Sequence, residues 1–275
     1  MTRITWLLNG LGSVALAACA TVTPASSRSA ADHHVPLEPY LRELMTVSAQ
    51  VGTQPLRFLF DTGAGLTLIT PTVARQLGCE PYGREVGHRM NGDAVEFQWC
   101  DPQDLRIGVS FVRHRDRIAV FDVNVLLPPS LPRLDGVLAL DSFRERMITL
   151  DWKDRLLTVH GSGSAPTVSR ARPSVRFATG DTGASLTVLL EVSGSRGPLW
   201  FLLDSGNLRG TLIGSHVVRD GLLSIAADTS IALRLGSGRT ARFTTIADAI
   251  SYDGVLGTDF LLAEPVTLDL RSPPN

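Results

Sequence analysis

Apolar and polar residues alternate in short runs along the chain, a pattern typical of β-strands rather than long helices. The segments "LMTVSAQV" (44–51) and "SLTVLLEVS" (185–193) are two such runs, and a second apolar segment follows each of them. Asn91-Gly92 separates "EVGHRM" from "DAVEFQW", and Gly236-Ser237-Gly238 separates "SIALRL" from "RTARFTTI". Because these dipeptides and tripeptides favour tight turns, the sequence predicts a β-hairpin at each place.

One short helix is predicted in each half of the chain. Thr70 can cap a helix, Pro71 suits its first position and Gly78 can end it. The segment "GSHVVRDGLL" (214–223) lies at the equivalent place in the second half. The pattern therefore predicts a mainly β protein with a short helix in each half.

Two pairs of motifs show that the chain repeats itself. "PLRFLFDTG" (55–63) matches "PLWFLLDSG" (198–206), and "DGVLALDSFRERMITLD" (135–151) aligns without gaps to "DGVLGTDFLLAEPVTLD" (253–269). The pairs occur in the same order, which predicts two similar units at 37–160 and 177–275. The Gly, Ser and Pro residues of 161–176 indicate a linker between them.

Asp61 and Asp204 stand at the same position of the repeated motif, directly after an apolar run. A buried carboxylate is costly unless it is paired or hydrogen-bonded, so each is expected to be the partner of the other. Two carboxylates a few ångströms apart share one proton. The ionised member can act as a general base toward water, and the protonated member can polarise a carbonyl group.

An apolar strand ending in Asp-Thr/Ser-Gly, with a later Asp-Gly-Val-Leu, resembles the aspartic peptidases. The chain is most similar to the bacterial retropepsin-like group, with two units fused. The resemblance implies two pseudo-symmetric retropepsin-like (acid-protease) β-barrel lobes with a short helix in each, and an aspartic endopeptidase with catalytic Asp61 and Asp204. It implies that Thr62, Gly63, Ser205 and Gly206 support the pair, and that the Asn91-Gly92 hairpin is a flap over the cleft. It further implies a monomer, an intramolecular pseudo-dimer, that needs no cofactor.

Two departures from the family pattern leave a second interpretation open. Asn207 stands where the family usually has Ala or Ser, and one extra residue follows it. Ala139 stands where the second unit has Gly257. Either change could displace a carboxylate by an ångström, which is enough to damage catalysis. The alternatives are a catalytically inactive pseudo-peptidase that binds extended peptides between the lobes, and a structural envelope lipoprotein.

The N-terminus "MTRITWLLNGLGSVALAAC" reads as a secretory signal, because one early cation precedes an apolar stretch that ends in small residues. Leu16-Ala17-Ala18-Cys19 resembles the lipobox of bacterial lipoproteins. This resemblance implies a signal peptide at 1–18, a lipidated Cys19, a flexible tether at 19–36, and an envelope lipoprotein in the outer membrane facing the periplasm. An ordinary signal peptide with a chance cysteine is the alternative.

The cysteines, the histidines and the net charge limit the kinds of ligand and partner that the sequence predicts. Cys79 and Cys100 form a disulfide or remain two thiols; export to an oxidising compartment would permit the bond. The six histidines are scattered, and neither CxxC nor HExxH occurs, so no metal site is predicted. The net charge is −1 without a basic block, which argues against nucleic acid. The expected partners are a peptide or protein substrate and a membrane reached through the lipid anchor.

Overall fold

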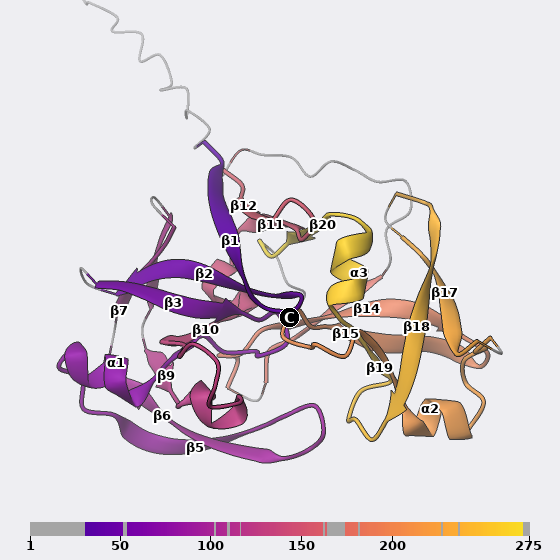
Figure 1. The fold of residues 1–275 in the computed structure, drawn as a ribbon, viewed down its shortest axis with the longest axis horizontal. Helices are drawn as coiled ribbons and strands as arrows, with labels where there is room; N and C mark the ends of the chain where they lie inside the picture. The colour runs from indigo at the N-terminus through magenta and orange to yellow at the C-terminus, as the bar shows by residue number, and fades with distance from the viewer. Residues whose placement is uncertain are drawn as a thin grey trace, which may run out of the picture.

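The structure is a computed structural model, and it describes residues 31–51, 54–101, 103–108, 111–115, 117–161, 163, 174–180, 182–226, 228–235 and 237–271. The predicted signal peptide, Cys19 and most of the tether lie outside these residues. No helix among the described residues is long and apolar enough to cross a membrane. The fold is mainly β and consists of two lobes, which Figure 1 shows side by side.

The first lobe is built on a sheet of 13 described strands, one of which comes from the end of the chain. Its strands are β1 (His33–Leu41), β2 (Leu44–Val51), β3 (Gln54–Phe60), β4 (Leu68–Ile69), β5 (Tyr82–His88), β6 (Ala94–Cys100), β7 (Gln103–Ile107), β8 (Phe111–Arg115), β9 (Ile118–Val120), β10 (Gly136–Leu138), β11 (Met147–Asp151), β12 (Leu156–Val159) and β20 (Val266–Asp269). Its helices are α1 (Pro71–Gln76) and the 3₁₀ turns η1 (Val123–Leu126) and η2 (Leu140–Phe143).

The second lobe contains a sheet of seven described strands in the order β13-β14-β15-β19-β16-β18-β17. These are β13 (Val175–Ala178), β14 (Thr187–Gly194), β15 (Gly197–Leu203), β16 (Thr211–Gly214), β17 (Ser230–Arg234), β18 (Thr240–Asp248) and β19 (Gly254–Leu256), with helices α2 (Ser215–Arg219) and α3 (Thr258–Ala263). The predicted strands, hairpins and short helices are present. Helix α3 was not predicted; the corresponding segment of the first lobe forms only the 3₁₀ turn η2.

The two repeated motifs come together in each lobe. Strand β3 lies parallel to β10, and β15 lies parallel to β19 in the same register. This packing requires glycine at the start of the later strand, because a Cβ at Gly136 would lie 2.6 Å from the Phe58 ring and one at Gly254 would lie 2.5 Å from the Phe201 ring. The repeat in the sequence is therefore a repeat in the structure.

The end of the chain joins the lobes. Strand β20 pairs antiparallel with β11, which pairs with β12, which in turn pairs with β1. Two predicted boundaries need correction. β1 begins at His33, so residues 33–36 belong to a strand of the sheet rather than to the tether, and β13 begins at Val175, so the second lobe starts two residues before 177.

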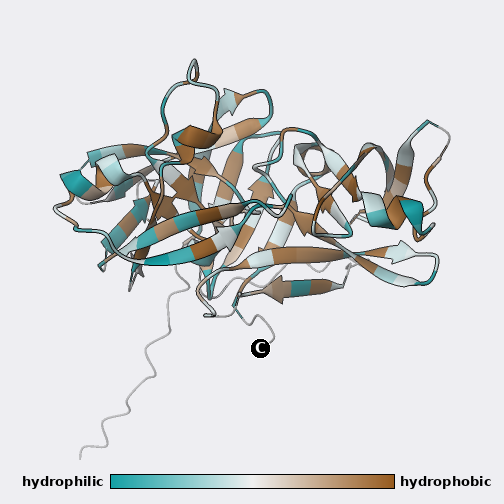
Figure 2. Cartoon of the chain, turned by 90° about the horizontal axis from the view of Figure 1, so that it is seen from below, coloured by the Kyte–Doolittle hydropathy of each residue, from teal (hydrophilic) through white to brown (hydrophobic). Residues whose placement is uncertain are grey.

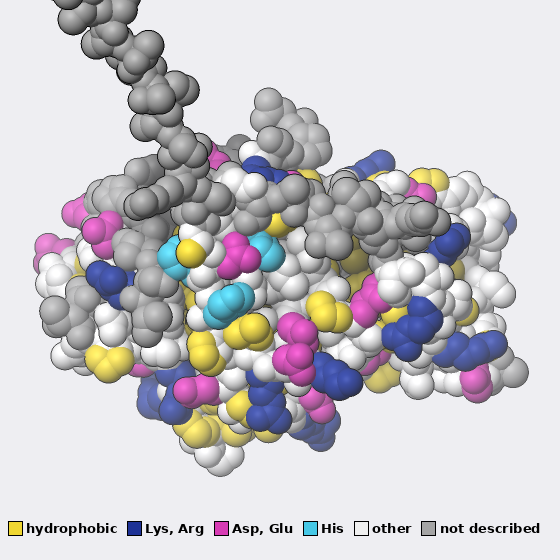
Figure 3. Space-filling model, turned by 90° about the horizontal axis from the view of Figure 1, so that it is seen from above, with side chains coloured by type: hydrophobic (Ala, Val, Ile, Leu, Met, Phe, Trp, Pro, Cys, Tyr) yellow, Lys and Arg dark blue, Asp and Glu magenta, His cyan; other side chains and the backbone are white. Residues whose placement is uncertain are grey.

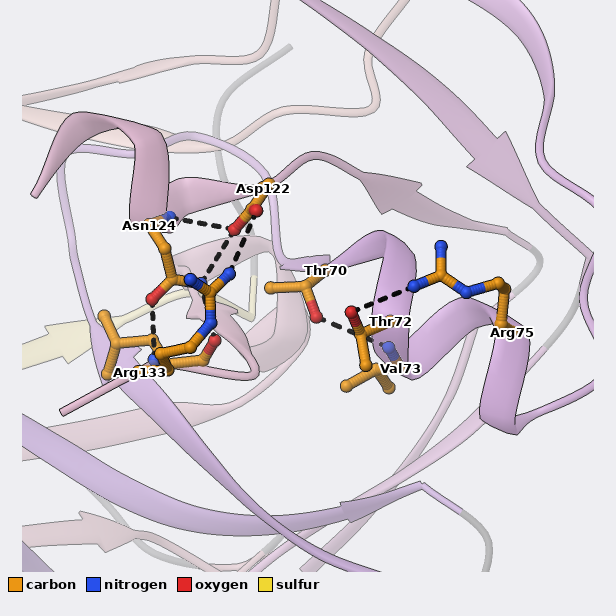
Figure 4. A network of polar contacts seen from close by, with 8 residues as sticks. Thr70, Thr72, Val73, Arg75, Asp122, Asn124 and Arg133 are labelled. Atoms are coloured by element: carbon orange, nitrogen blue, oxygen red, sulfur yellow. Dashed lines mark hydrogen bonds and ion pairs between the residues drawn. The ribbon is translucent and has the colours of Figure 1, made fainter. Parts of the chain in front are cut away.

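Helix α1 begins as the sequence predicts. The Thr70 hydroxyl accepts a hydrogen bond from the Val73 N–H at 3.4 Å, with Pro71 as the first helical residue. In the neighbouring loop Asp122 and Asn124 hold the turn before β10, where the Asn124 amide donates to the Leu134 carbonyl at 2.9 Å. Figure 4 shows both networks. They fix the start of α1 and the loop that leads into β10, the strand that lies beside β3.

A continuous apolar core runs through both lobes, and its largest fully buried side chains include Trp152, Phe58, Phe60 and Phe201. Figure 2 shows apolar residues concentrated along the inner strands and hydrophilic ones at the outer turns. Figure 3 shows basic and acidic side chains intermixed over one face. The described side chains visible on this face form no single-sign patch, in line with the net charge of −1.

Candidate active site

Asp61 and Asp204 each follow the central strand of their lobe. The Asp61 N–H donates to the Leu138 carbonyl at 3.0 Å, and the Asp204 N–H donates to the Leu256 carbonyl at 2.9 Å. The parallel strand of the second motif therefore fixes each aspartate at the strand end. Asp204 is 5% exposed, so it lies inside the protein rather than on an outer surface.

Thr62 and Ser205 bind each other's lobe directly. The Thr62 hydroxyl donates to the Leu203 carbonyl at 2.8 Å and accepts from the Ser205 N–H at 3.0 Å. The Ser205 hydroxyl donates to the Phe60 carbonyl at 3.0 Å and accepts from the Thr62 N–H at 3.0 Å. Both side chains are 0% exposed. Four buried hydrogen bonds therefore hold the two strand ends together, as the resemblance implied for these residues.

Gly63 and Gly206 bring each carboxylate against the opposite lobe. A Cβ on Gly63 would lie 2.5 Å from Cγ of Asp204, and a Cβ on Gly206 would lie 2.5 Å from Cγ of Asp61. Real Cβ atoms do not approach so closely, so only glycine fits at either position. The two aspartates thus lie next to each other at the junction of the lobes.

The electrostatics of the two aspartates differ. Burial raises the pKa of Asp61, while hydrogen bonds from the backbone of Gly63, Ala64 and Gly206 and from Asp204 oppose the rise. Burial and the charge of Asp61 raise the pKa of Asp204 well above its usual value, with only the Gly206 N–H opposing. The charge of Asp61 and the smaller number of donors make the rise in pKa larger at Asp204, and the two carboxylates titrate as a pair that shares one proton.

The extra residue after Asn207 does not disturb this geometry. The Asn207 amide donates to the Gly210 carbonyl at 2.8 Å and accepts from the Arg209 N–H at 3.0 Å, so a local turn accommodates the insertion. The N–H of Gly206 lies 2.9 Å from Oδ1 of Asp204, and the N–H of Gly63 lies 2.9 Å from Oδ1 of Asp61. The displacement that the sequence suggested is therefore absent at this bond.

The other motif aspartates are hydrogen-bonded to their own lobe. Asp141 accepts from the Thr67 N–H and hydroxyl at 3.0 and 2.6 Å, and Asp259 accepts from Thr211 in the same way at 3.1 and 2.9 Å. Asp135 and Asp253 accept backbone N–H groups from the strands β3 and β15, both at 2.8 Å. These contacts hold turns and strand ends within each lobe.

The Asn91-Gly92 hairpin reaches the second lobe. At its tip, the Met90 carbonyl accepts a hydrogen bond of 2.8 Å from the Ser251 N–H. The Met90 side chain packs with Tyr252 against a buried cluster that includes Ile250 and Leu202, a residue of the strand that leads to Asp204. Burial and the negative charge of Asp204 raise the pKa of Tyr252. The hairpin therefore bridges the lobes beside the pair, where a flap was expected.

Sequence reasoning missed the second-lobe residues that receive the hairpin. Ile250-Ser251-Tyr252 directly precede the second Asp-Gly-Val-Leu, and that proximity to a recognised motif was the available signal. Of the remaining predicted residues, Cys79 and Cys100 form a disulfide with Cα atoms 5.9 Å apart, which connects the end of α1 to strand β6. The described residues contain no group of three or more side chains that could hold a metal ion.

Comparison with known proteins gives a sequence match within the first lobe and a structural match that extends over both lobes. Residues 47–124 match the family described as "gag-polyprotein putative aspartyl protease". A search of curated proteins found no match. The chain is similar in structure to basic 7S globulin from soybean (8% identity, TM-score 0.53) and to conglutin gamma, a basic 7S globulin from lupine seeds (9% identity, TM-score 0.55). Each alignment covers 88% of this chain and 93% of the other. The likeness shows a shared fold.

Proposed function

We propose that the chain is an aspartic endopeptidase that hydrolyses peptide bonds with a water molecule activated by Asp61 and Asp204. The observation that carries the proposal is the carboxylate pair itself: two aspartates from two lobes, Asp204 buried and Asp61 partly exposed, each against the other's glycine and both with a raised pKa. The protein-family match over residues 47–124 includes Asp61 and the hairpin and supports the same reaction class.

The two aspartates then take different roles. Ionised Asp61 accepts a proton from water, which attacks the peptide carbonyl carbon. Protonated Asp204 donates a hydrogen bond to the carbonyl oxygen and stabilises the oxyanion that forms there. Collapse of this tetrahedral intermediate breaks the C–N bond, and the proton that Asp61 took from water passes to the departing amine nitrogen. The Thr62 and Ser205 hydrogen bonds keep both carboxylates in position, so little reorganisation is needed when the charge develops.

The test is cleavage of a mixed peptide library from about pH 3 to 8, the range that spans ordinary and raised carboxyl pKa values. The wild type should cleave, with activity falling when both carboxylates are protonated and again when both ionise. Asp61→Asn and Asp204→Asn should each abolish cleavage and leave the fold intact, because Asn is nearly isosteric with Asp. A wild type that cuts nothing across this range would favour a peptide-binding protein without activity.

We further propose that this peptidase is exported and held on the envelope by lipid on Cys19, as the lipobox resemblance implies. The Cys79–Cys100 disulfide supports an oxidising compartment. Cys19→Ser should move the protein from the membrane fraction to the soluble fraction on cell fractionation. A variant that still sediments with membranes would exclude this anchor.

A further inference from the structure

The lobes differ in how their sheets close. In the first lobe the second half of β2 pairs with β7, with Gln50 opposite Arg106. In the second lobe β14 is the counterpart of β2 and β17 is the counterpart of β7, yet these two strands do not pair in the described structure. A cavity of about 970 Å³ opens between them instead.

The strand registers identify which residues of β14 and β17 correspond to the β2–β7 pair of the first lobe. Gln50 lies opposite Pro55 in the first lobe, and Ser193 lies opposite Pro198 in the second, so Ser193 corresponds to Gln50. Leu105-Arg106-Ile107 corresponds to Leu233-Arg234-Leu235, because a three-residue turn follows each segment. Arg234 is therefore the counterpart of Arg106, and the pair Ser193–Arg234 is missing.

Both edges of the gap present backbone groups to it. On β14 the N–H groups of Glu191 and Ser195 donate outward, to the carbonyls of Ser174 and Leu222. Since backbone groups alternate sides along a strand, Ser193 between them also points its N–H and carbonyl into the gap.

On β17 the Ser230 carbonyl accepts from the Ala226 N–H on the side away from β18. By the same alternation, Ala232 and Arg234 direct their N–H and carbonyl groups into the gap. Among the described residues, no strand pairs with β14 at Ser193 or with the outer side of β17 at Ala232 and Arg234, so the two walls are open at these three residues.

The floor and rim of the cavity favour an amphipathic strand. Buried apolar side chains line the interior, among them Val192, Ile231, Leu233 and Phe260. At the rim the Arg234 side chain is exposed and has no ion-pair partner among the described residues. An acidic group in a bound segment would complement this cation.

We propose that this groove, between residues 192–195 of β14 and 230–234 of β17, binds an extended peptide segment of a partner protein by strand addition. The segment carries apolar side chains at alternate positions, which point to the floor, and an acidic residue beside Arg234. Its backbone bonds to Ser193 on one side and to Ala232 on the other. The site is built from second-lobe strands and does not use the aspartate pair.

The experiment uses the full chain carrying Asp61→Asn and Asp204→Asn, so that no probe is cleaved. The probe is a fluorescein-labelled peptide Glu-Thr-Val-Thr-Val-Glu, and the control peptide carries Pro in place of the Thr between the two Val residues. Fluorescence anisotropy should show binding of the probe only. Hydrogen exchange should show new protection of the Ala232 and Arg234 amides on binding.

Matched variants locate the contact. Ala232→Pro removes the Ala232 N–H that faces the groove but spares the bonds to β18, and it should weaken binding about tenfold. Ala232→Val keeps this N–H and should bind normally. Arg234→Glu should weaken binding of the acidic probe, and it decides the question if thermal unfolding shows that the Pro variant does not fold. Protection confined to the β5–β6 hairpin, unchanged binding by Ala232→Pro and Arg234→Glu, or amides of β17 already protected in the free protein would each overturn the proposal.

Discussion

At the scale of single residues, burial raises the pKa of both Asp61 and Asp204, and the charge of Asp61 together with fewer N–H donors makes the rise larger at Asp204. Gly63, Ala64 and Gly206 all stabilise charge on Asp61, whereas Gly206 alone does so for Asp204. The second motif has Asn207 where the first has Ala64, and the Asn207 turn continues toward Gly210 instead. The backbone donors therefore differ between the two carboxylates, although the bonds from Gly63 to Asp61 and from Gly206 to Asp204 are equal in length, 2.9 Å each.

The raised pKa of Asp204 predicts a pH dependence of stability. The folded protein keeps a proton that the unfolded chain releases, so this contribution is full below the ordinary carboxyl pKa. It is lost as pH rises toward the raised pKa of Asp204. We expect Asp204→Asn to lose less unfolding free energy than the wild type between about pH 4 and 8, by roughly 1 kcal/mol or more. Urea unfolding across this range measures the difference, with Glu80→Gln on the surface as the control; parallel curves for wild type and Asp204→Asn would contradict the shift.

At the scale of elements, the β5–β6 hairpin depends on the second lobe for its position. The turn itself is a local property of Asn91-Gly92, so the sequence predicted it. The docking of its tip on Ser251 and Tyr252 depends on residues some 160 positions away, and no local pattern indicated it. The same holds for the open edge of β17. The β17–β18 hairpin is a local feature that the sequence predicts, whereas the lack of pairing between β17 and β14 depends on tertiary packing.

Removing the Ser251 N–H should release the hairpin tip. Ser251→Pro deletes the donor to the Met90 carbonyl, and we expect faster hydrogen exchange at residues 88–94 with little change in global stability, about 1 kcal/mol. Ser251→Ala keeps the N–H and serves as the control. Equal exchange rates in the two variants would show that the apolar packing of Met90 alone holds the tip.

At the scale of the whole molecule, the lobes are joined by the buried Thr62–Ser205 contacts and by the sheet that contains β20. The repeated motifs predicted the two lobes and the site residues Asp61, Asp204, Thr62 and Ser205. They did not predict that β20 would leave its own lobe, because an edge strand with "VTLD" can pair with any open strand, and the choice depends on tertiary packing.

The cross-lobe hydrogen bonds should behave as a unit. Thr62→Val and Ser205→Ala each leave buried partners without a hydrogen bond, at a cost of about 1–3 kcal/mol. Because each hydroxyl bonds to the other residue's N–H, the double variant should lose less than the sum of the single variants. Denaturant unfolding of the four proteins gives the coupling energy. An additive result would mean that the two hydroxyls act independently.

Strand β20 follows every other described element in the sequence, yet it completes a sheet that begins with β1. During synthesis the amino-terminal half is therefore complete before β11 has its partner strand β20 and before Asp61 has its partner Asp204. The aspartate pair and the strand that ties the lobes together arrive only when translation has passed the second motif. A nascent chain consequently lacks the complete pair until Asp204 has been added and the second lobe has folded against the first.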